Sequence, residues 1–244
     1  MTNEIFVKIK NCSLSGIDSI KRVQSLRQMF LKPGKISGSV IPILKDISFS
    51  CKSGDRVALV GGNGSGKSSI LKLIAGIYPP AEGTIRINGK ITSIIEMGLG
   101  VESEFSGRQN IKILMLYNNM LDRYSKEFEQ KVIDFSELGE KIDQSIKNFS
   151  SGMLSRLAFS ICIFQTPDIL LLDEVFAAGD GKFIKKSLEF MKNKINTVPI
   201  TILVSHQESI IKEHCNRCIL VKNGRIVEDG DTDRVLSIYN SGNY

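Results

Sequence analysis

The stretch Gly61-Gly62-Asn63-Gly64-Ser65-Gly66-Lys67-Ser68 decides how this chain folds. It matches the pattern G-x-x-x-x-G-K-[ST] at every fixed position, follows the apolar residues 57–60, and opens a segment, 67–77, that we predict to be a helix. Glycines let successive backbone N–H groups turn toward one point, and the start of a helix adds partial positive charge there. The sequence therefore predicts a phosphate-binding loop.

Side chains at the end of this loop are predicted to act on a bound nucleotide. Lys67 reaches the β- and γ-phosphates as a point charge. The hydroxyl of Ser68 is a hard oxygen ligand of the kind that Mg²⁺ prefers. The predicted nucleotide-contacting residues of the loop are Gly61, Gly62, Asn63, Gly64, Ser65, Gly66, Lys67, Ser68 and Ser69.

Two carboxylates follow the apolar run 169–172, which reads as a buried strand. The carboxyl ends of parallel strands face the ligand crevice of an α/β sheet. We expect Asp173 to hold Mg²⁺ and Glu174 to polarise the water that attacks the nucleotide. Because strands often end in acidic residues, this pattern alone is weak evidence. After a phosphate loop it indicates nucleotide hydrolysis.

A second predicted helix start lies shortly before that strand. Ser150, Ser151 and Gly152 are expected to cap a helix that runs to Phe164. The N-terminus of this second helix can also bind phosphate, so Ser150 and Gly152 are candidate nucleotide contacts. Plain capping is the alternative reading of the same residues.

Strands and helices alternate along most of the chain, which predicts an α/β fold with a parallel sheet in one domain, 1–244. Residues of about 100–165 interrupt the alternation and read as an inserted helical subdomain. The early strands predict an antiparallel layer at one edge. Expected strands are 5–9, 43–51, 56–60, 84–87, 91–95, 169–172, 200–204, 218–222 and 225–228; expected helices include 67–77, 182–195, 208–214 and 232–239.

Composition narrows the class of protein. The chain has 244 residues, of which 42% are hydrophobic and 24% charged, so it can bury a full core and is neither collagen-like nor disordered. No stretch approaches the roughly 18 apolar residues that cross a bilayer. The N-terminus lacks the pattern of a signal peptide, so we expect the chain to stay where it is made. Five scattered cysteines argue against a disulfide scaffold, and Cys215 and Cys218 read as structural.

The net charge of +6 is concentrated in one window and indicates an anionic partner. Residues 20–45 contain six basic side chains and no acidic one, and apolar residues recur there every three or four positions. This pattern predicts a basic amphipathic insertion. It remains open whether that insertion is a solvated surface helix or a helix that lies against anionic lipid headgroups.

Taken together, these motifs resemble the nucleotide-binding subunit of ABC transporters. The L-S-G-G-Q signature of that family corresponds to Phe149-Ser150-Ser151-Gly152-Met153, and the switch histidine corresponds to His206. The resemblance implies that Lys67, Glu174 and His206 are catalytic, that Asp180 belongs to the D-loop, and that Glu96 replaces the usual glutamine as a metal ligand. An adenine-stacking aromatic residue is missing from residues 14–17. The second histidine, His214, is expected at the surface.

Where the chain departs from the general family pattern, its residues resemble those of ATPases that export O-antigen, capsule and teichoic-acid polysaccharides. They include Ser151-Gly152-Met153, Glu96-Met97-Gly98-Leu99-Gly100 and Phe105-Ser106-Gly107-Arg108-Gln109. The resemblance implies a P-loop NTPase of the ABC ATPase fold, with a RecA-like core, an antiparallel β subdomain and an inserted helical subdomain. It also implies the short form of the subunit, without a carbohydrate-binding domain after residue 244.

The same resemblance implies a way of working. ATP and Mg²⁺ are the expected cofactors, and two copies are expected to close over the nucleotides. A separate integral membrane permease is the expected partner and makes the main contact with the polysaccharide, while nucleic acid is not expected to bind. The chain would lie peripherally on the cytoplasmic face of the inner membrane. Alternatives are an exporter ATPase for lipid or drug cargo, a soluble ABC ATPase that acts on nucleic acid or ribosomes, and a regulatory module without turnover.

Overall fold

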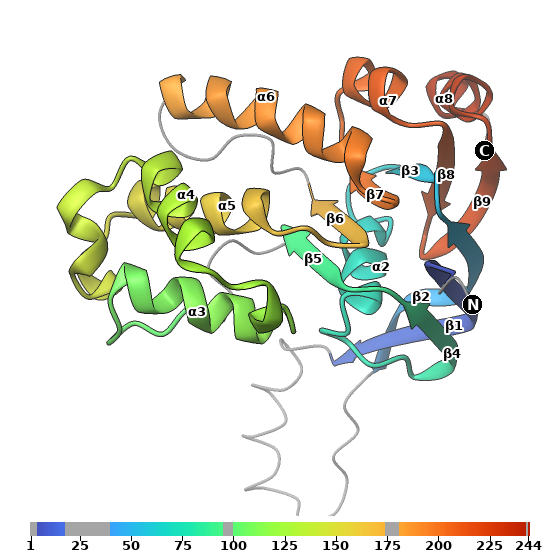
Figure 1. The fold of residues 1–244 in the computed structure, drawn as a ribbon. Helices are drawn as coiled ribbons and strands as arrows, with labels where there is room; N and C mark the ends of the chain where they lie inside the picture. Colours follow the sequence, from blue (N-terminus) through green and yellow to red (C-terminus); the bar gives the residue numbers. More distant parts are fainter. Residues whose placement is uncertain (1–3, 18–39, 95–99, 174–180, 243) are drawn as a thin grey trace, which may run out of the picture.

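The computed structural model describes residues 4–17, 40–94, 100–173, 181–242 and 244. Within these residues the strands form two sheets, one of six strands and one of three. Helices cover both faces of the larger sheet, and a group of helices extends from one end of it (Figure 1). The predicted α/β class is confirmed.

The larger sheet brings together the strands that carry most of the predicted motifs. Its order is β5 (Ile91–Ile94), β6 (Ile169–Asp173), β7 (Ile200–Val204), β3 (Arg56–Val60), β8 (Arg217–Lys222) and β9 (Arg225–Gly230). All neighbours pair in parallel except β8 and β9, which form an antiparallel hairpin around Asn223-Gly224. The carboxyl ends of the five parallel strands therefore lie along one edge.

The smaller sheet is the predicted antiparallel layer. Its order is β2 (Val40–Lys52), β1 (Phe6–Ile17) and β4 (Glu82–Asn88). Strand β1 continues well beyond the predicted 5–9. The prediction stopped short because Asn11 adopts a left-handed backbone (φ 49°) and the register with β2 shifts between Ile9 and Cys12. Such an irregularity breaks the alternation by which a strand is recognised in sequence.

Strand β2 also corrects the boundary of the predicted basic insertion. Residues 40–45 of the 20–45 window are strand and pair with the end of β1. The predicted amphipathic helix falls on 18–39 and so lies outside the described residues.

Two hydrophobic layers hold the sheets and helices together. Alternate side chains of β3 illustrate the division, because Val57 and Leu59 pack with the small sheet and α2 (Lys67–Ile74), whereas Ala58 and Val60 face the opposite helices. That second layer contains side chains from α5 (Ser151–Phe164), α6 (Gly181–Thr197), α7 (Glu208–His214) and α8 (Thr232–Ser241). The phosphate-loop strand is thus buried on both faces.

The chain between β5 and β6 folds into the expected group of helices. These are α3 (Gly107–Tyr117), α4 (Lys126–Ser136) and α5, joined by short 3-10 turns η1 (Leu121–Arg123), η2 (Gly139–Asp143) and η3 (Ile146–Asn148). They share a hydrophobic cluster of their own, which includes Ile111, Met115, Val132 and Leu157. The sequence pattern did not separate α3 from α4, which begin after the serine caps Ser106 and Ser125.

An ion-pair network around the buried carboxylate of Glu129 joins two of these helices. The Arg108 guanidinium of α3 donates to Glu129 of α4 at 3.0 Å and to Asp143 at 2.7 Å. Burial alone would raise the pKa of Glu129, but hydrogen bonds from Tyr124, Lys126 and Arg108 lower it overall. The carboxylate therefore stays charged, and α3 and α4 are held together partly by charge.

Two local predictions were wrong. Helix α2 ends at Ile74 instead of continuing to residue 77, because Gly76 is left-handed and the N–H of Ile77 returns to the carbonyl of Lys72. His214 is buried, with 4% of its surface exposed, because the last turn of α7 faces the sheet.

Candidate functional site

The predicted phosphate loop connects β3 to α2. Lys67 is the first residue of α2 and is only 6% exposed, and its Nζ donates to the carbonyls of Gly61 and Gly62 at 2.9 and 3.0 Å. No side chain caps the start of this helix. The helix end, the glycine backbone and the lysine thus surround one point, as an anion site requires.

Two glycines of the loop are fixed by their surroundings. Gly61 has φ 147°, and a Cβ there would lie 2.1 Å from the carbonyl oxygen of Val221. Gly66 has φ 111°, and a Cβ there would lie 2.7 Å from a methyl carbon of Leu44. By contrast, a Cβ at Gly62 or Gly64 would have no neighbour within 4 Å. The first pair holds the shape of the loop, and the second pair borders open space.

The loop is also braced from the far end of the chain. The N–H of Gly224, in the β8–β9 turn, donates to the carbonyl of Ser65 at 2.8 Å, and the carbonyl of Gly224 accepts from Lys45 N at 2.8 Å. A cavity of about 280 Å³ opens beside these residues and is lined by Ile43, Gly64, Ser65, Gly66, Lys67, Ser68 and Ser69. The hydroxyl of Ser65 is buried and has no hydrogen-bond partner among the described residues. A polar atom in this position suits a hydrogen-bonding ligand.

Strand register brings Asp173 and His206 to the same edge. Asp173 is the last residue of β6 and pairs with Val204 of β7, which in turn pairs with Leu59 of β3. His206 follows β7 by two positions and is exposed. Ser68 is the second residue of α2, directly after the loop. The candidate groups therefore meet where β6, β7 and β3 end, while Glu96, Glu174 and Asp180 lie outside the described residues.

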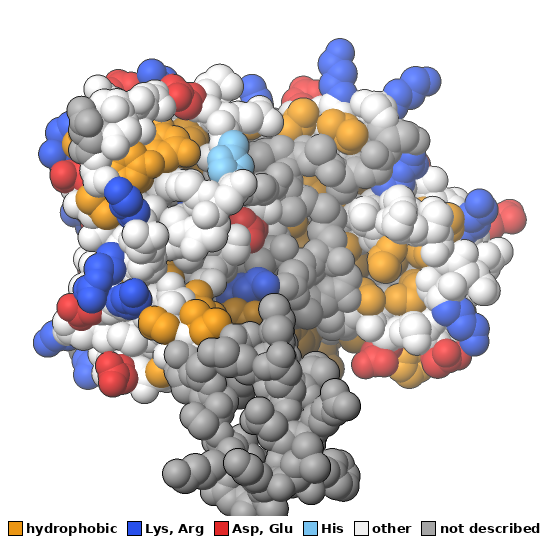
Figure 2. All heavy atoms as spheres, turned by 180° about the vertical axis from the view of Figure 1, so that it is seen from behind, with side chains coloured by type: hydrophobic (Ala, Val, Ile, Leu, Met, Phe, Trp, Pro, Cys, Tyr) orange, Lys and Arg blue, Asp and Glu red, His pale blue; other side chains and the backbone are white. Residues whose placement is uncertain are grey.

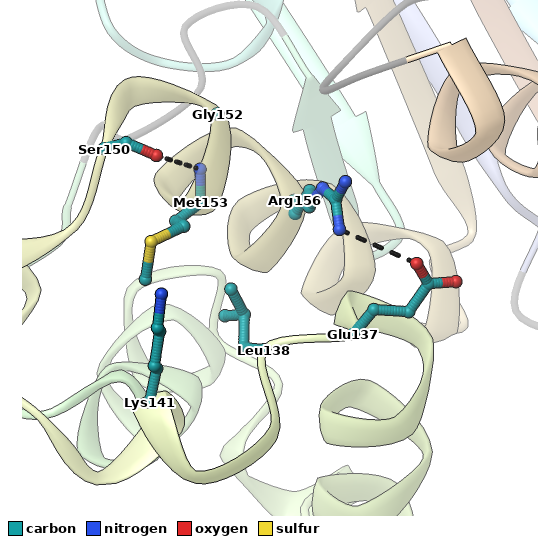
Figure 3. A pocket seen from close by; sticks show the side chains of 7 residues that line it. All are labelled: Glu137, Leu138, Lys141, Ser150, Gly152, Met153 and Arg156. Atoms are coloured by element: carbon teal, nitrogen blue, oxygen red, sulfur yellow. Dashed lines mark hydrogen bonds and ion pairs between the residues drawn. The ribbon is translucent and has the colours of Figure 1, made fainter.

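The second helix start is formed as the sequence predicts. Ser150 is the N-cap of α5, and its hydroxyl accepts from the N–H of Met153 at 3.2 Å. The turn is open to solvent, because a Cβ at Gly152 would meet only the hydroxyl of Ser150, at 3.9 Å. It borders a cavity of about 460 Å³ lined by Glu137, Leu138, Lys141, Ser150, Gly152, Met153 and Arg156 (Figure 3).

These two cavities share no lining residue. The loop cavity is lined by the phosphate loop, the start of α2 and Ile43 of β2, whereas the cavity at Ser150 is lined by α5, its N-cap, and the chain from Glu137 to Lys141 that follows α4. Within one copy of the chain, the two predicted phosphate-binding helix starts therefore line separate cavities.

Charge is not gathered in one place on the face seen from behind. Figure 2 shows Lys and Arg side chains mainly around the edge of that face, with Asp and Glu among them. The residues that this view describes therefore form no broad basic surface there. The net positive charge by itself does not locate a partner.

The cysteines have no metal or redox arrangement among the described residues. Cys12, Cys51, Cys215 and Cys218 are buried, no disulfide links them, and no cluster of three or more His, Cys, Asp or Glu is placed to hold a metal ion. Burial raises the pKa of Cys215 and of Cys218 to about 12. Both therefore pack as neutral side chains, in keeping with a structural role.

Comparison with known proteins identifies the family. Residues 44–177, which include the loop, the Ser150 turn and Asp173, match the family profile described as ABC transporter. The chain belongs to the ABC transporter family. As an ABC-type ATPase it binds and hydrolyses ATP.

Several curated relatives of this ABC ATPase are subunits of export systems. It is 39% identical over 199 residues to the O-antigen export system ATP-binding protein RfbB of Klebsiella pneumoniae, and the matched residues cover 80% of each chain. It is 37% identical to RfbE of Yersinia enterocolitica, over 94% of this chain and 98% of that one. The teichoic acids export ATP-binding protein TagH of Listeria innocua is 36% identical, over 85% of this chain and 64% of its own length.

Solved structures agree on the fold of the ABC ATPase. The ATP-binding cassette MJ0796, solved as a dimer in a post-hydrolysis state with ADP and Pi, aligns with a TM-score of 0.68 over 93% of this chain and 98% of that chain, at 20% identity. An ATP-binding subunit of an ABC transporter aligns with a TM-score of 0.70 over 98% of this chain and 95% of that chain, at 21% identity.

Sequence reasoning missed the charged residues beside Ser150. Glu137, Lys141 and Arg156 line its cavity but belong to no recognised motif. Glu137 lies 13 positions before Ser150, and nothing in its immediate neighbours marks it. Its left-handed backbone (φ 56°), unusual for a glutamate, is visible only in the structure.

Proposed function

We propose that this chain is the ATP-hydrolysing subunit of an exporter that moves a polysaccharide, such as a lipid-linked O-antigen, through a separate integral membrane permease. The single observation that carries this proposal is its similarity to export subunits of both O-antigen and teichoic acid systems over most of the chain. Those relatives share a polymer cargo although the polymers differ.

Within that function the site residues divide the work. Gly61, Gly62, Asn63, Gly64, Ser65, Gly66, Lys67, Ser68 and Ser69 hold the phosphates. Glu174 and His206 orient the attacking water, and Asp180 belongs to the segment that follows Glu174. Since phosphoryl transfer asks for positioning and charge stabilisation more than covalent chemistry, few side chains are required.

The donors present fit a magnesium ion. The Ser68 hydroxyl and the Asp173 carboxylate are hard oxygen donors, the first at the start of α2 and the second at the end of β6. Glu96 is the proposed third ligand. When bound, the ion would neutralise charge on the β- and γ-phosphates.

Two copies of the chain complete each site in this proposal. Ser150 and Gly152 line a cavity separate from the loop, so they would face the nucleotide held by the second copy. MJ0796, which has the same fold, was solved as a dimer. ATP would hold the copies together, and its hydrolysis would release them.

The permease would dock on the helical group. The structure exposes Phe105, Leu116, Tyr117 and Leu121 at the start of α3, its end and the turn that follows, with Leu116 64% exposed. Tyr117 also borders a cavity of about 410 Å³ between this helix, β5 and the end of α2. Apolar side chains in such positions favour a protein interface. The cargo would be contacted mainly by the permease.

The same proposal sets the location of the chain. Among the described residues, no helix has both the length and the apolar character to cross a membrane. Binding to a permease would therefore hold the chain peripherally, at the cytoplasmic face of the inner membrane. We expect added DNA or RNA to leave the ATPase rate unchanged, and a stimulation would favour the soluble alternative.

Mixing two inactive variants tests the shared site. Lys67→Ala removes the loop lysine and Ser150→Ala removes the opposing serine, so each homodimer should lack turnover. A heterodimer retains one complete site and should recover up to about half of the normal rate per dimer, if sites act independently. Full activity of either variant alone contradicts the shared site.

Glu174→Gln tests the hydrolytic step separately. We expect turnover to fall by about 10²–10⁴-fold with ATP binding retained, since only the base is lost. The control is Glu189→Gln, at an exposed position of α6. Glycan release from cells that carry the matching permease should stop with Glu174→Gln and continue with Glu189→Gln.

A further inference from the structure

Glu137 connects three helices at the cavity beside Ser150. It directly follows α4, and its carboxylate pairs with Lys186 of α6 at 2.8 Å and with Arg156 of α5 at 3.6 Å. Figure 3 shows Arg156 and Glu137 turned toward each other across one wall, with Ser150 and Met153 at another part of the cavity. A single carboxylate thus touches cations from two further helices.

Both cations are anchored by aromatic rings as well. The Arg156 guanidinium lies over the ring of Phe183 at 5.1 Å, and Lys186 Nζ lies over the ring of Phe135 at 4.3 Å. Lys186 also donates to the carbonyl of Phe135 at 3.2 Å. These contacts restrict where the cations can sit, so their positions are well defined before Glu137 joins them.

The backbone of Glu137 is held in an unfavourable conformation. Its φ of 56° lies in the left-handed region, which costs free energy for a residue with a side chain. The chain adopts this conformation where α4 ends. From this conformation the Glu137 carboxylate forms its ion pairs with Arg156 and Lys186.

The two helices joined by Glu137 adjoin different candidate site residues in the sequence. Helix α5 begins at the Ser150 turn, and Arg156 lies in its second turn. Helix α6 begins directly after residues 174–180, which contain Glu174 and Asp180, and Lys186 lies in its second turn. Glu137 therefore joins the helix that presents Ser150 to the helix that follows the hydrolytic residues.

We propose that Glu137 is a positioning residue for ATP hydrolysis, which fixes the start of α5 against α6 so that Ser150 and Gly152 meet the nucleotide held by a second copy. The inference rests on the shared site of the proposed function. Glu137 touches no nucleotide itself, and it acts through Arg156 and Lys186.

Homodimers give the first test. Glu137→Gln keeps the size and left-handed backbone of the residue but removes the charge. We expect kcat to fall about fivefold, with the affinity of the loop for a fluorescent ATP analogue unchanged within about twofold. The matched control is Glu140→Gln, an exposed glutamate in η2 that has no ion pair with another described residue.

Heterodimers separate positioning from a general structural role. In a mixture of Lys67→Ala and Ser150→Ala chains, the Lys67→Ala copy supplies the working Ser150 turn. Glu137→Gln added to that copy should lower the rate about fivefold, and the same change in the Ser150→Ala copy should alter it less than about twofold. A structural effect would lower both equally.

The outcomes of the mixture are distinct. Equal loss in both placements, or loss only in the Ser150→Ala copy, overturns the proposed route through α5 while the shared site stands. A parental mixture without activity overturns the shared site, and the role of Glu137 with it. Activity that depends on the Lys67→Ala copy carrying Glu137 supports both.

A second variant approaches the same network from α6. Lys186→Met removes the closer cation and keeps a long apolar side chain over Phe135, and Lys185→Met is the control at an exposed neighbour that has no ion pair with another described residue. We expect Lys186→Met to reproduce the fall in kcat and Lys185→Met to have no effect. The midpoint of thermal unfolding should change by less than about 3 °C in both, since exposed ion pairs stabilise weakly.

Discussion

The phosphate loop and the Ser150 turn are both helix starts that suit phosphate, but they are held in different ways. Backbone contacts and buried packing surround the loop, with Gly61 against Val221 and Gly224 against Ser65. The Ser150 turn is exposed, and it is held by one local cap and by ion pairs near the solvent. The loop is enclosed by its own chain, whereas the turn is open to solvent and, in the proposed function, faces a second copy.

The largest expected effect breaks the loop itself. Gly61→Ala requires a left-handed alanine and a 2.1 Å contact with the Val221 carbonyl, so we expect a loss of about 3 kcal/mol or more in the free energy of unfolding. The thermal midpoint should then fall by about 6–12 °C.

Gly62→Ala is the matched change in the same loop. Its Cβ would have no neighbour within 4 Å, so stability should change by less than about 0.5 kcal/mol. Equal destabilisation by the two substitutions, measured by urea unfolding, would show that the loop is not fixed by the Val221 contact.

An intermediate effect is expected in the charged helical group that carries the turn. Glu129→Gln removes the carboxylate that Arg108, Lys126 and Tyr124 surround, and should cost about 2 kcal/mol at pH 7. The pKa of Glu129 is lowered from its ordinary value of 4.5, so its charge stabilises the folded state above that pH. The difference between wild type and variant should therefore shrink as the pH falls below 4.5.

Hydrogen exchange locates that effect. We expect the amides of α3 and α4 to lose protection in Glu129→Gln at pH 7, while those of β3 and α2 keep theirs. Gln130→Glu, on the exposed side of α4, is the control. Uniform loss of protection across the chain would mean that the helical group and the phosphate-loop region unfold together, so that the two regions do not differ in local stability.

A smaller change in stability than at Gly61 or Glu129 is expected at the Ser150 turn. Ser150→Ala removes the cap of α5 and should cost about 1 kcal/mol, or about 2–4 °C in the thermal midpoint. Ser151→Ala, one position later and exposed, should cost less. ATP turnover should nevertheless fall far more with Ser150→Ala than with Ser151→Ala, and a parallel loss of both properties would reduce Ser150 to a cap.

Some elements could be predicted closely because their patterns are local. Strand β7 and helix α7 have the predicted bounds, since a short apolar run or a clear helical period ends at each side. Helix α8 begins at Thr232 as predicted, directly after its N-cap Asp231. The loop and the Ser150 cap also depend on neighbours in sequence, and both form as expected.

Other features depend on distant partners and left no local signal. The hydrogen bond from Gly224 to Ser65 and the ion pairs of Glu137 with Arg156 and Lys186 span long stretches of sequence. His214 was expected at the surface because its residue type is polar, but the orientation of α7 against the sheet decided its burial. Residue chemistry could nominate the groups of the candidate site, whereas their supporting contacts depend on tertiary packing.

The brace from Gly224 has a consequence for how the protein is made. A ribosome completes residues 61–68 long before it adds the β8–β9 turn, so the newly emerged motif lacks both the strand beside β3 and the contact with Ser65. A Cβ at Gly224 would also lie 2.3 Å from the Ile43 carbonyl, so the closing piece must fit tightly. Nascent chains arrested before residue 224 should therefore fail to retain ATP, and this capacity should arise late in synthesis.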